Sequence, residues 1–333
     1  MPAPAVRFLV HRGRLGGPSP DLLAENTVSA ARAAVRLEPA YVEVDTRNLA
    51  DGTIVLRHNP KVVLVAGQPA TPLAALTREQ FAAANDALFR DLSFDALLDL
   101  VAQAPAETRF VLDLKDLDGQ RPEANLSAYF DAIAARGLEH RVVLISWNIW
   151  VLRGLIELNR ARPPERRLRL GLSFVPMPLP SWTFRPLAWL VNRVFRGSFG
   201  AVVFYNLADA PQAALCRNGL FPICLERIAT VRRSLGEDAI LCFHKVFARS
   251  WFRRTFGPLL GLSRDLAEPP RAVWLYDYDS LAEVRALNTR FVAGLAQDEL
   301  VLFSRILDRF DFKAEERRLS QAVSGEWRTA RVG

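Results

Sequence analysis

Side chains able to do acid, base or metal chemistry follow several short apolar runs in the first third of the sequence. Three carboxylates without a neighbouring cysteine suit a hard cation such as Mg²⁺ or Ca²⁺, which prefers oxygen ligands. Two histidines beside such a cation suit a phosphodiester, because one can take a proton from the attacking oxygen while the other gives one to the leaving alcohol. The groups are His11 with Arg12, Glu43 with Asp45, His58, and Asp113 with Lys115.

Each of these groups also has a purely structural interpretation, since a single histidine or carboxylate at a strand end is usually a surface residue or a helix cap. Their joint occurrence favours a function, because a buried strand face tolerates unpaired charge poorly unless a metal or ligand compensates it. We therefore expect a cation on the carboxylates, proton transfer by the histidines, and phosphate binding by the arginine and the lysine. The carboxylates are Glu43, Asp45 and Asp113, the histidines His11 and His58, and the cationic pair Arg12 and Lys115.

Short apolar strands alternate with helical patterns through most of the chain, which is typical of a parallel sheet with crossover helices. The carboxyl ends of such strands converge on one ligand site, so groups far apart in sequence can meet there. We predict an α/β fold, a TIM-type (β/α)8 barrel with irregular late insertions. The nine candidate strands, one more than a barrel needs, are 7–11, 40–45, 53–58, 109–115, 141–146, 168–174, 201–205, 272–276 and 290–295.

The length of 333 residues fits one barrel domain. We place that domain at residues 1–312, including a helix from 27 to 37 capped by Asn26 or Thr27 and a last helix near 300–310. Residues 313–333 are polar and are expected to form a C-terminal tail that frays. No internal repeat or low-complexity linker indicates a second domain.

The formal charge of +7 favours an anionic partner without identifying it. The chain lacks zinc-finger spacing, an arginine-rich run and an aromatic RNA-binding signature, so we expect no nucleic acid. Its three cysteines form no close pair, which fits a reducing compartment. The first ten residues lack the basic head and apolar stretch of a signal peptide, so we expect a cytoplasmic protein.

The motifs of this segment resemble those of the glycerophosphodiester phosphodiesterase family, whose barrels are similar to phosphatidylinositol phospholipase C. The resemblance rests on His11-Arg12-Gly13, Glu25-Asn26-Thr27, Glu43-Val44-Asp45, and Asp51-Gly52 followed by His58. It implies that the two histidines are the acid and base and that the Glu-x-Asp pair binds a divalent cation. Glu25 and Asn26 are interpreted as structural residues that fix the first helix near the site.

Three positions depart from the family pattern. Asp113-Leu114-Lys115 stands where the family usually has Glu-x-Lys, so the third metal ligand would be a shorter carboxylate. His58-Asn59 stands where the family has His-Asp, and Gln297-Asp298 where it has a late Thr-Asp, and these two departures leave the substrate open. The resemblance implies hydrolysis of a glycerophosphodiester or a lysophospholipid headgroup to an alcohol and glycerol phosphate. The alternatives are a lyase or a phospholipase D-like enzyme acting on lysolipids, and a non-catalytic barrel that binds an anionic lipid or a protein.

Two basic, aromatic segments lie outside this pattern, at residues 178–196 and 243–254. Arginine mixed with aromatic rings suits an interfacial position, so either segment is a candidate for peripheral membrane contact with a lysophospholipid substrate. The alternative is that their arginines snorkel over the outside of the barrel.

Overall fold

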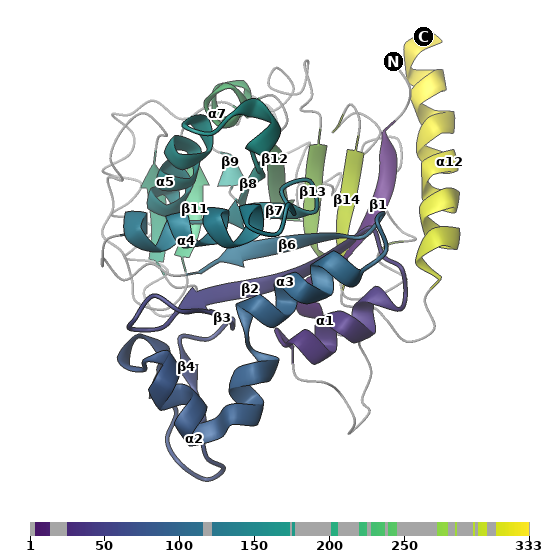
Figure 1. Cartoon of the computed structure of the whole chain (residues 1–333). Helices are drawn as coiled ribbons and strands as arrows, with labels where there is room; N and C mark the ends of the chain where they lie inside the picture. The colour runs from purple at the N-terminus through teal and green to yellow at the C-terminus, as the bar shows by residue number, and fades with distance from the viewer. Residues whose placement is uncertain are drawn as a thin grey trace.

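Eight parallel strands form a closed barrel in the computed structural model of this chain (Figure 1). The first barrel strand pairs with the second on one side and with the last on the other, which completes the ring. This confirms the TIM-type barrel expected from the sequence. In chain order the barrel strands are β1 (Ala5–Val10), β2 (Tyr41–Asn48), β6 (Arg109–Leu114), β7 (Val142–Ser146), β8 (Arg169–Ser173), β12 (Ile240–His244), β13 (Ala272–Tyr278) and β14 (Glu299–Ser304).

The structure describes most of the first half of the chain and separate elements of the second half. The described residues are 4–13, 25–115, 122–173, 175–176, 201–205, 220–224, 228–236, 239–244, 272–278, 284, 296, 299–304 and 311–332. Within them, no helix has the length and apolar character needed to cross a membrane.

Helices lie outside the ring of strands, and most of them cover the outward faces of the strands (Figure 1). The amphipathic character of these covering helices explains their position, since each buries one apolar stripe against the sheet. The described helices are α1 (Val28–Val35), α2 (Arg78–Asp91), α3 (Phe94–Gln103), α4 (Pro122–Ala134), α5 (Ile149–Arg160), α7 (Ile228–Leu235) and α12 (Phe312–Val332).

Helix α12 runs alongside β1 and differs from the polar tail expected at residues 313–333 (Figure 1). The β2 strand pairs with β1 only at Leu9 and Val10, which leaves earlier β1 amides without a strand partner on that side. Side chains of α12 satisfy them: Phe8 N donates to Glu316 Oε1 at 2.8 Å, and Val6 N to Ser320 Oγ at 3.0 Å. The apolar stripe of this helix is narrow, which is why the sequence reads as polar. It consists of Phe312, Leu319 and Val323.

Three of the nine predicted strands are not seen in the barrel. Residues 53–58 contain β3 (Ile54–Leu56), which pairs antiparallel with β2 outside the ring. Residues 201–205 form β10 (Ala201–Tyr205) in a separate parallel sheet with β11 (Leu220–Cys224) and β9 (Val175–Pro176). The prediction at 290–295 lies outside the described residues.

Two barrel strands, β12 and β14, were not predicted from the sequence. The helix expected near 300–310 is wrong at its start, because residues 299–304 are β14. Both strands are buried on two faces, so each reads as a continuous apolar run without the alternation that marks a half-exposed strand. Such a run cannot be told from a buried helical segment by periodicity alone.

The barrel interior is filled by side chains from alternate strand positions. The Tyr41 and Trp274 rings pack with centroids 5.0 Å apart, and both side chains are almost fully buried. Tyr41 also donates its hydroxyl to Glu299 Oε1 at 2.8 Å, and Arg169 Nη1 lies 3.2 Å from Glu299 Oε2. This packed core closes the barrel below the carboxyl ends of the strands.

Candidate active site

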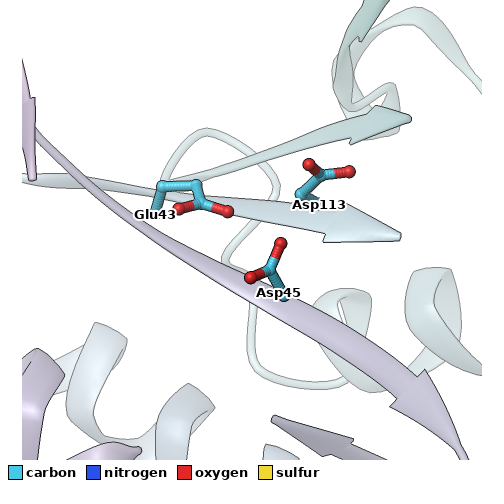
Figure 2. A group of neighbouring side chains, drawn as sticks. All are labelled: Glu43, Asp45 and Asp113. Atoms are coloured by element: carbon cyan, nitrogen blue, oxygen red, sulfur yellow. The ribbon is translucent and has the colours of Figure 1, made fainter. Parts of the chain in front are cut away.

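Three carboxylates converge at the carboxyl ends of two neighbouring strands (Figure 2). Glu43 and Asp45 share one face of β2 because they are two residues apart, and Asp113 on β6 is in register with Asp45. One oxygen of each carboxylate lies within 4.8 Å of the others. All three side chains are buried, so the cluster concentrates like charge in a place with little water.

That crowding changes the proton affinities of the three groups in different directions. Burial raises the pKa of Glu43 well above its usual value, and Asp45 and Asp113 raise it further. Burial also raises the pKa of Asp113, against the opposing effect of Lys115. Burial would raise the pKa of Asp45 too, but Lys115 and Arg12 reverse the effect and hold it below its usual range. Asp45 is therefore the carboxylate that the protein's own cations keep ionised.

Two cationic side chains enclose the cluster. Lys115 Nζ lies 3.0 Å from Asp45 Oδ1 and 2.5 Å from Asp113 Oδ2. Arg12 Nε lies 3.1 Å from Asp45 Oδ2, and Arg12 Nη1 is 2.8 Å from Glu25 Oε1. Both cations keep donors beyond these contacts, which suits them to an incoming phosphate.

The turn after β1 is held in an uncommon backbone conformation that brings it onto the cluster. Arg12 has φ 58° and ψ 24°, in the left-handed region, and its amide donates to Glu43 Oε2 at 2.7 Å. Gly13 follows at φ +60°, where a Cβ would lie 3.0 Å from the backbone nitrogen of Ala31 in α1. A non-glycine residue would be strained there and would also push helix α1 away.

Asn26 ties the start of α1 to the same strand. Its Nδ2 donates to Asp45 Oδ2 at 3.0 Å, while Asp45 N donates to Asn26 Oδ1 at 2.7 Å. Its own amide donates to Arg12 O at 2.9 Å, and Thr27 caps the helix by accepting from Ala30 N. These contacts agree with the structural role expected of Asn26, and they also orient a carboxylate of the cluster.

The two histidines come from different strand ends, His11 after β1 and His58 after β3. His11 Nε2 is 3.7 Å from Glu43 Oε2. Burial lowers the pKa of His58, against the effect of Asp45, and the charges of Arg12 and Lys115 also lower it. His58 Nδ1 contacts Asn59 Oδ1 at 3.2 Å.

Sequence reasoning missed Arg47, which links the loops that carry two of the expected groups. Its Nε donates to His58 O at 2.8 Å, and its Nη1 donates to Lys115 O at 3.3 Å. The signal was present in the period of β2, where Glu43, Asp45 and Arg47 occupy alternate positions. The structure thus brings together all seven residues singled out from the sequence and adds one that positions them.

The cluster fits a divalent cation by two independent features. Glu43 Oε1 and Asp113 Oδ1 are buried and have no hydrogen-bond partner, an arrangement that is costly unless a ligand compensates it. The donors are all carboxylate oxygens, the set that Mg²⁺ and Ca²⁺ prefer. With carboxylates that could hold a cation, two histidines and two cationic side chains, the arrangement is suited to acid and base catalysis on a phosphate ester.

The two basic, aromatic segments proposed for membrane contact lie almost wholly outside the described residues. Only Phe243 and His244 of residues 243–254 are described, at the end of β12, and none of residues 178–196 is.

Comparison with known proteins gives one family and a group of similar folds. Residues 11–215, more than half of the chain, match the Glycerophosphoryl diester phosphodiesterase family. No individual curated protein matches the chain.

Similar solved structures cover nearly the whole chain at low sequence identity. A glycerophosphodiester phosphodiesterase from Parabacteroides distasonis has a TM-score of 0.55 at 11% identity, over 96% of this chain and 98% of that one. A phosphodiesterase from Oleispira antarctica, solved with its product sn-glycerol-3-phosphate, has a TM-score of 0.52 at 14% identity, over 96% and 97%. At these identities the likeness shows the fold.

Proposed function

This chain belongs to the glycerophosphoryl diester phosphodiesterase family and is a phosphoric diester hydrolase, and we propose that it hydrolyses a glycerophosphodiester or a lysophospholipid headgroup with the help of a divalent cation. The observation that carries the proposal is the buried cluster of Glu43, Asp45 and Asp113 flanked by two histidines. The product sn-glycerol-3-phosphate bound by the Oleispira antarctica enzyme supports this substrate class.

His58 is suited to act as the general base. Asn59 Oδ1 can only accept a hydrogen bond, so its contact with His58 Nδ1 requires the proton on Nδ1 and leaves a lone pair on Nε2. Burial lowers the pKa of His58, with Asp45 opposing, so the ring is neutral at pH 7. It would take the proton from a water molecule, or from the substrate hydroxyl next to the phosphate, as that oxygen attacks phosphorus.

His11 is suited to act as the general acid. Its Nε2 lies 3.7 Å from Glu43 Oε2, which places the imidazole at the edge of the carboxylate cluster. It would give its proton to the leaving alcohol as the phosphorus–oxygen bond breaks. Well-placed acid and base groups are typically worth about 10²- to 10⁴-fold in rate.

Arg12 and Lys115 would hold the phosphate against the cluster, and Glu43, Asp45 and Asp113 would hold Mg²⁺ or Ca²⁺. A bound cation supplies neutralising charge to the phosphate oxygens. We propose further that residues 1–312 act as one catalytic domain, that the protein is cytoplasmic, which suits the free Cys242, and that contact with a membrane is peripheral.

The experiment is to incubate the purified protein with glycerophosphocholine, glycerophosphoethanolamine or lysophosphatidylcholine, in Mg²⁺, Ca²⁺ or EDTA. The variants His11→Ala, His58→Ala and Glu43→Ala serve beside the native protein, with His140→Ala as a matched histidine control outside the site. We expect metal-dependent release of the headgroup alcohol, with glycerol phosphate from the glycerophosphodiesters and acylated glycerol phosphate from the lysolipid, which the three site variants lose and the control keeps.

The products separate the remaining alternatives. A cyclic phosphate as the final product would identify a lyase, and headgroup release from the lysolipid but not from the glycerophosphodiesters would identify a phospholipase D-like enzyme acting on lysolipids. A folded protein that binds cation and turns over none of these substrates would contradict the proposal and favour a binding function.

A further inference from the structure

An exposed hairpin follows His58 directly in the chain. Strands β4 (Lys61–Val62) and β5 (Thr71–Pro72) pair antiparallel and enclose a connection at residues 63–70. We call residues 61–72 the valine hairpin. In Figure 1, β4 and the neighbouring α2 extend away from the barrel beyond β3, so the hairpin belongs to a projection from the barrel rather than to its wall.

The valine hairpin presents apolar side chains to solvent. Val63 is 46% exposed and Val65 is 45% exposed, whereas Val62 is buried and Leu64 packs against the core. The alternation places the two valines on the outward side, two residues apart. Among the described residues, the large hydrophobic side chains with this degree of exposure are Val63, Val65 and Leu37, so two of the three lie in this hairpin.

Polar contacts hold the valine hairpin in place. Asn85 Nδ2 donates to Leu64 O at 3.0 Å, Gln68 N donates to Val65 O at 3.1 Å, and Leu73 N donates to Pro60 O at 2.9 Å. These hydrogen bonds therefore hold the two exposed valines in a fixed position. Val62 and Leu64 already pack the hairpin against the core. Apolar side chains at Val63 and Val65 are therefore not needed for this packing.

The stretch of sequence that carries the valine hairpin has charges of one sign, whereas helix α2 beside it also carries acidic residues. Residues 52–78 contain no aspartate or glutamate, and they contain Arg57, Lys61 and Arg78. Lys61 is exposed at the base of the hairpin. Exposed apolar side chains beside basic ones, in a chain of net charge +7, suit the boundary of an anionic lipid layer, where valine enters the acyl region and lysine meets the phosphates.

We propose that the valine hairpin docks this protein onto anionic lipid surfaces, with Val63 and Val65 entering the lipid and Lys61 contacting its headgroups. Because the hairpin follows His58 by a few residues, docking would hold the catalytic mouth at the lipid surface, and this last step rests on the proposed function. The docking itself does not, since it is a property of the hairpin and can be measured without turnover.

The test is co-sedimentation of the full chain with vesicles of phosphatidylcholine, alone or mixed with phosphatidylglycerol. The double variant Val63→Ser/Val65→Ser is compared with the control variant Leu37→Ser. Leu37 is also apolar and 37% exposed, but it lies just before β2 begins, outside the valine hairpin. We expect binding to mixed vesicles that rises at low salt, falls about tenfold in the double variant, and is unchanged in the control.

Hydrolysis of water-soluble glycerophosphocholine is measured on the same samples and should be equal in all three proteins. Failure of the native protein to bind either vesicle, equal binding by the double variant, or equal loss in Leu37→Ser would each overturn the docking proposal. Absent hydrolysis with hairpin-dependent binding would contradict the catalytic proposal alone.

Discussion

Lys115 Nζ lies 3.0 Å from Asp45 Oδ1, so the carboxylate cluster contains a cation of the protein's own. The same ammonium contacts Asp113 Oδ2. Both aspartates are buried, and the lysine offsets much of the repulsion between them in the absence of metal.

Replacing this lysine should make folding depend on added cation. Removing one partner of a buried ion pair leaves uncompensated charge and typically costs about 3–5 kcal/mol. We expect Lys115→Met to lower the free energy of unfolding by roughly that amount in EDTA and to recover part of the loss in saturating Mg²⁺ or Ca²⁺. Denaturant unfolding measures it, with exposed Lys61→Met as the control. Equal stability of Lys115→Met and native protein in EDTA would contradict this account.

The opposite response is expected from neutralising Glu43. The substitution Glu43→Gln removes a negative charge whose burial is unfavourable, and the new amide oxygen can still accept from Arg12 N. The metal-free variant should therefore unfold at the same or a higher temperature than the native protein. A cation at about 100 times its Kd stabilises a native protein by roughly 2.7 kcal/mol, and the variant should lose most of that gain. A full metal response in Glu43→Gln would count against the proposed site.

The acid limb of catalysis should lie below pH 6.5, the ordinary pKa of histidine. A general base must be neutral, and burial, with Asp45 opposing it, lowers the pKa of His58, so protonation inactivates the enzyme only at lower pH. A cation bound nearby would act in the same direction. The measurement is kcat/KM against pH with glycerophosphocholine, with His140→Asn as a control of unchanged profile. An acid limb above pH 7 would mean that His58 is not the base.

The functional residues were easier to predict from sequence than the strands that complete the barrel. Glu43, Asp45 and Asp113 are charged residues within apolar strands, and the period of two places the first pair on one face whatever the rest of the chain does. Strands β12 and β14 lack a comparable sequence signal, because a strand buried on both faces does not alternate apolar and polar residues. The contacts of Asn26 depend on its uncommon backbone angle, and those of Arg47 depend on the course of the chain after β3 and β6, neither of which residue types alone specify.

A hidden hydrophobic pattern also explains why a polar tail was predicted from the sequence where the structure has helix α12. Its buried residues Phe312, Leu319 and Val323 have helical spacing, but the long polar stretches between them hide the apolar stripe in the linear sequence. Glu316 is an acceptor for the backbone of β1, a role that only the three-dimensional arrangement reveals.

The base of the barrel should limit stability at alkaline pH. Burial and then Glu299 raise the pKa of Tyr41 to about 12 from its ordinary value of 10.0. A raised pKa means that its contribution is fully present below pH 10 and is lost as the pH rises through about 12. The shift corresponds to roughly 3 kcal/mol of unfolding free energy.

The variant Tyr41→Phe should therefore lose less stability than the native protein between pH 10 and 12, although it is less stable at pH 8 for want of the hydrogen bond to Glu299. Denaturant unfolding at several pH values tests this, and tyrosinate absorbance should show one high-pKa group fewer in the variant. Parallel alkaline stability curves for the two proteins would rule the explanation out.

Gly13 should tolerate alanine poorly. An added Cβ would meet the backbone of α1 at 3.0 Å, and φ of +60° adds strain. We expect Gly13→Ala to cost about 2–4 kcal/mol of unfolding free energy and to weaken cation binding, because the turn carries Arg12. Gly67→Ala is the matched control, since Gly67 also has positive φ but nothing lies within 4 Å of its Cβ position. Its cost should be about 1–2 kcal/mol. Similar losses in both variants would show that backbone strain, and not contact with α1, sets the cost.

The pairing of β1 has a consequence for the newly made chain. Its lasting partners are β14 on one edge and α12 on the other side, and both come from the last tenth of the sequence. While a ribosome makes the intervening residues, the first strand has only a short pairing with β2 to protect its amides. An unpaired, apolar strand edge is a site for aggregation, so nascent chains of this protein should depend on chaperones until synthesis is almost complete.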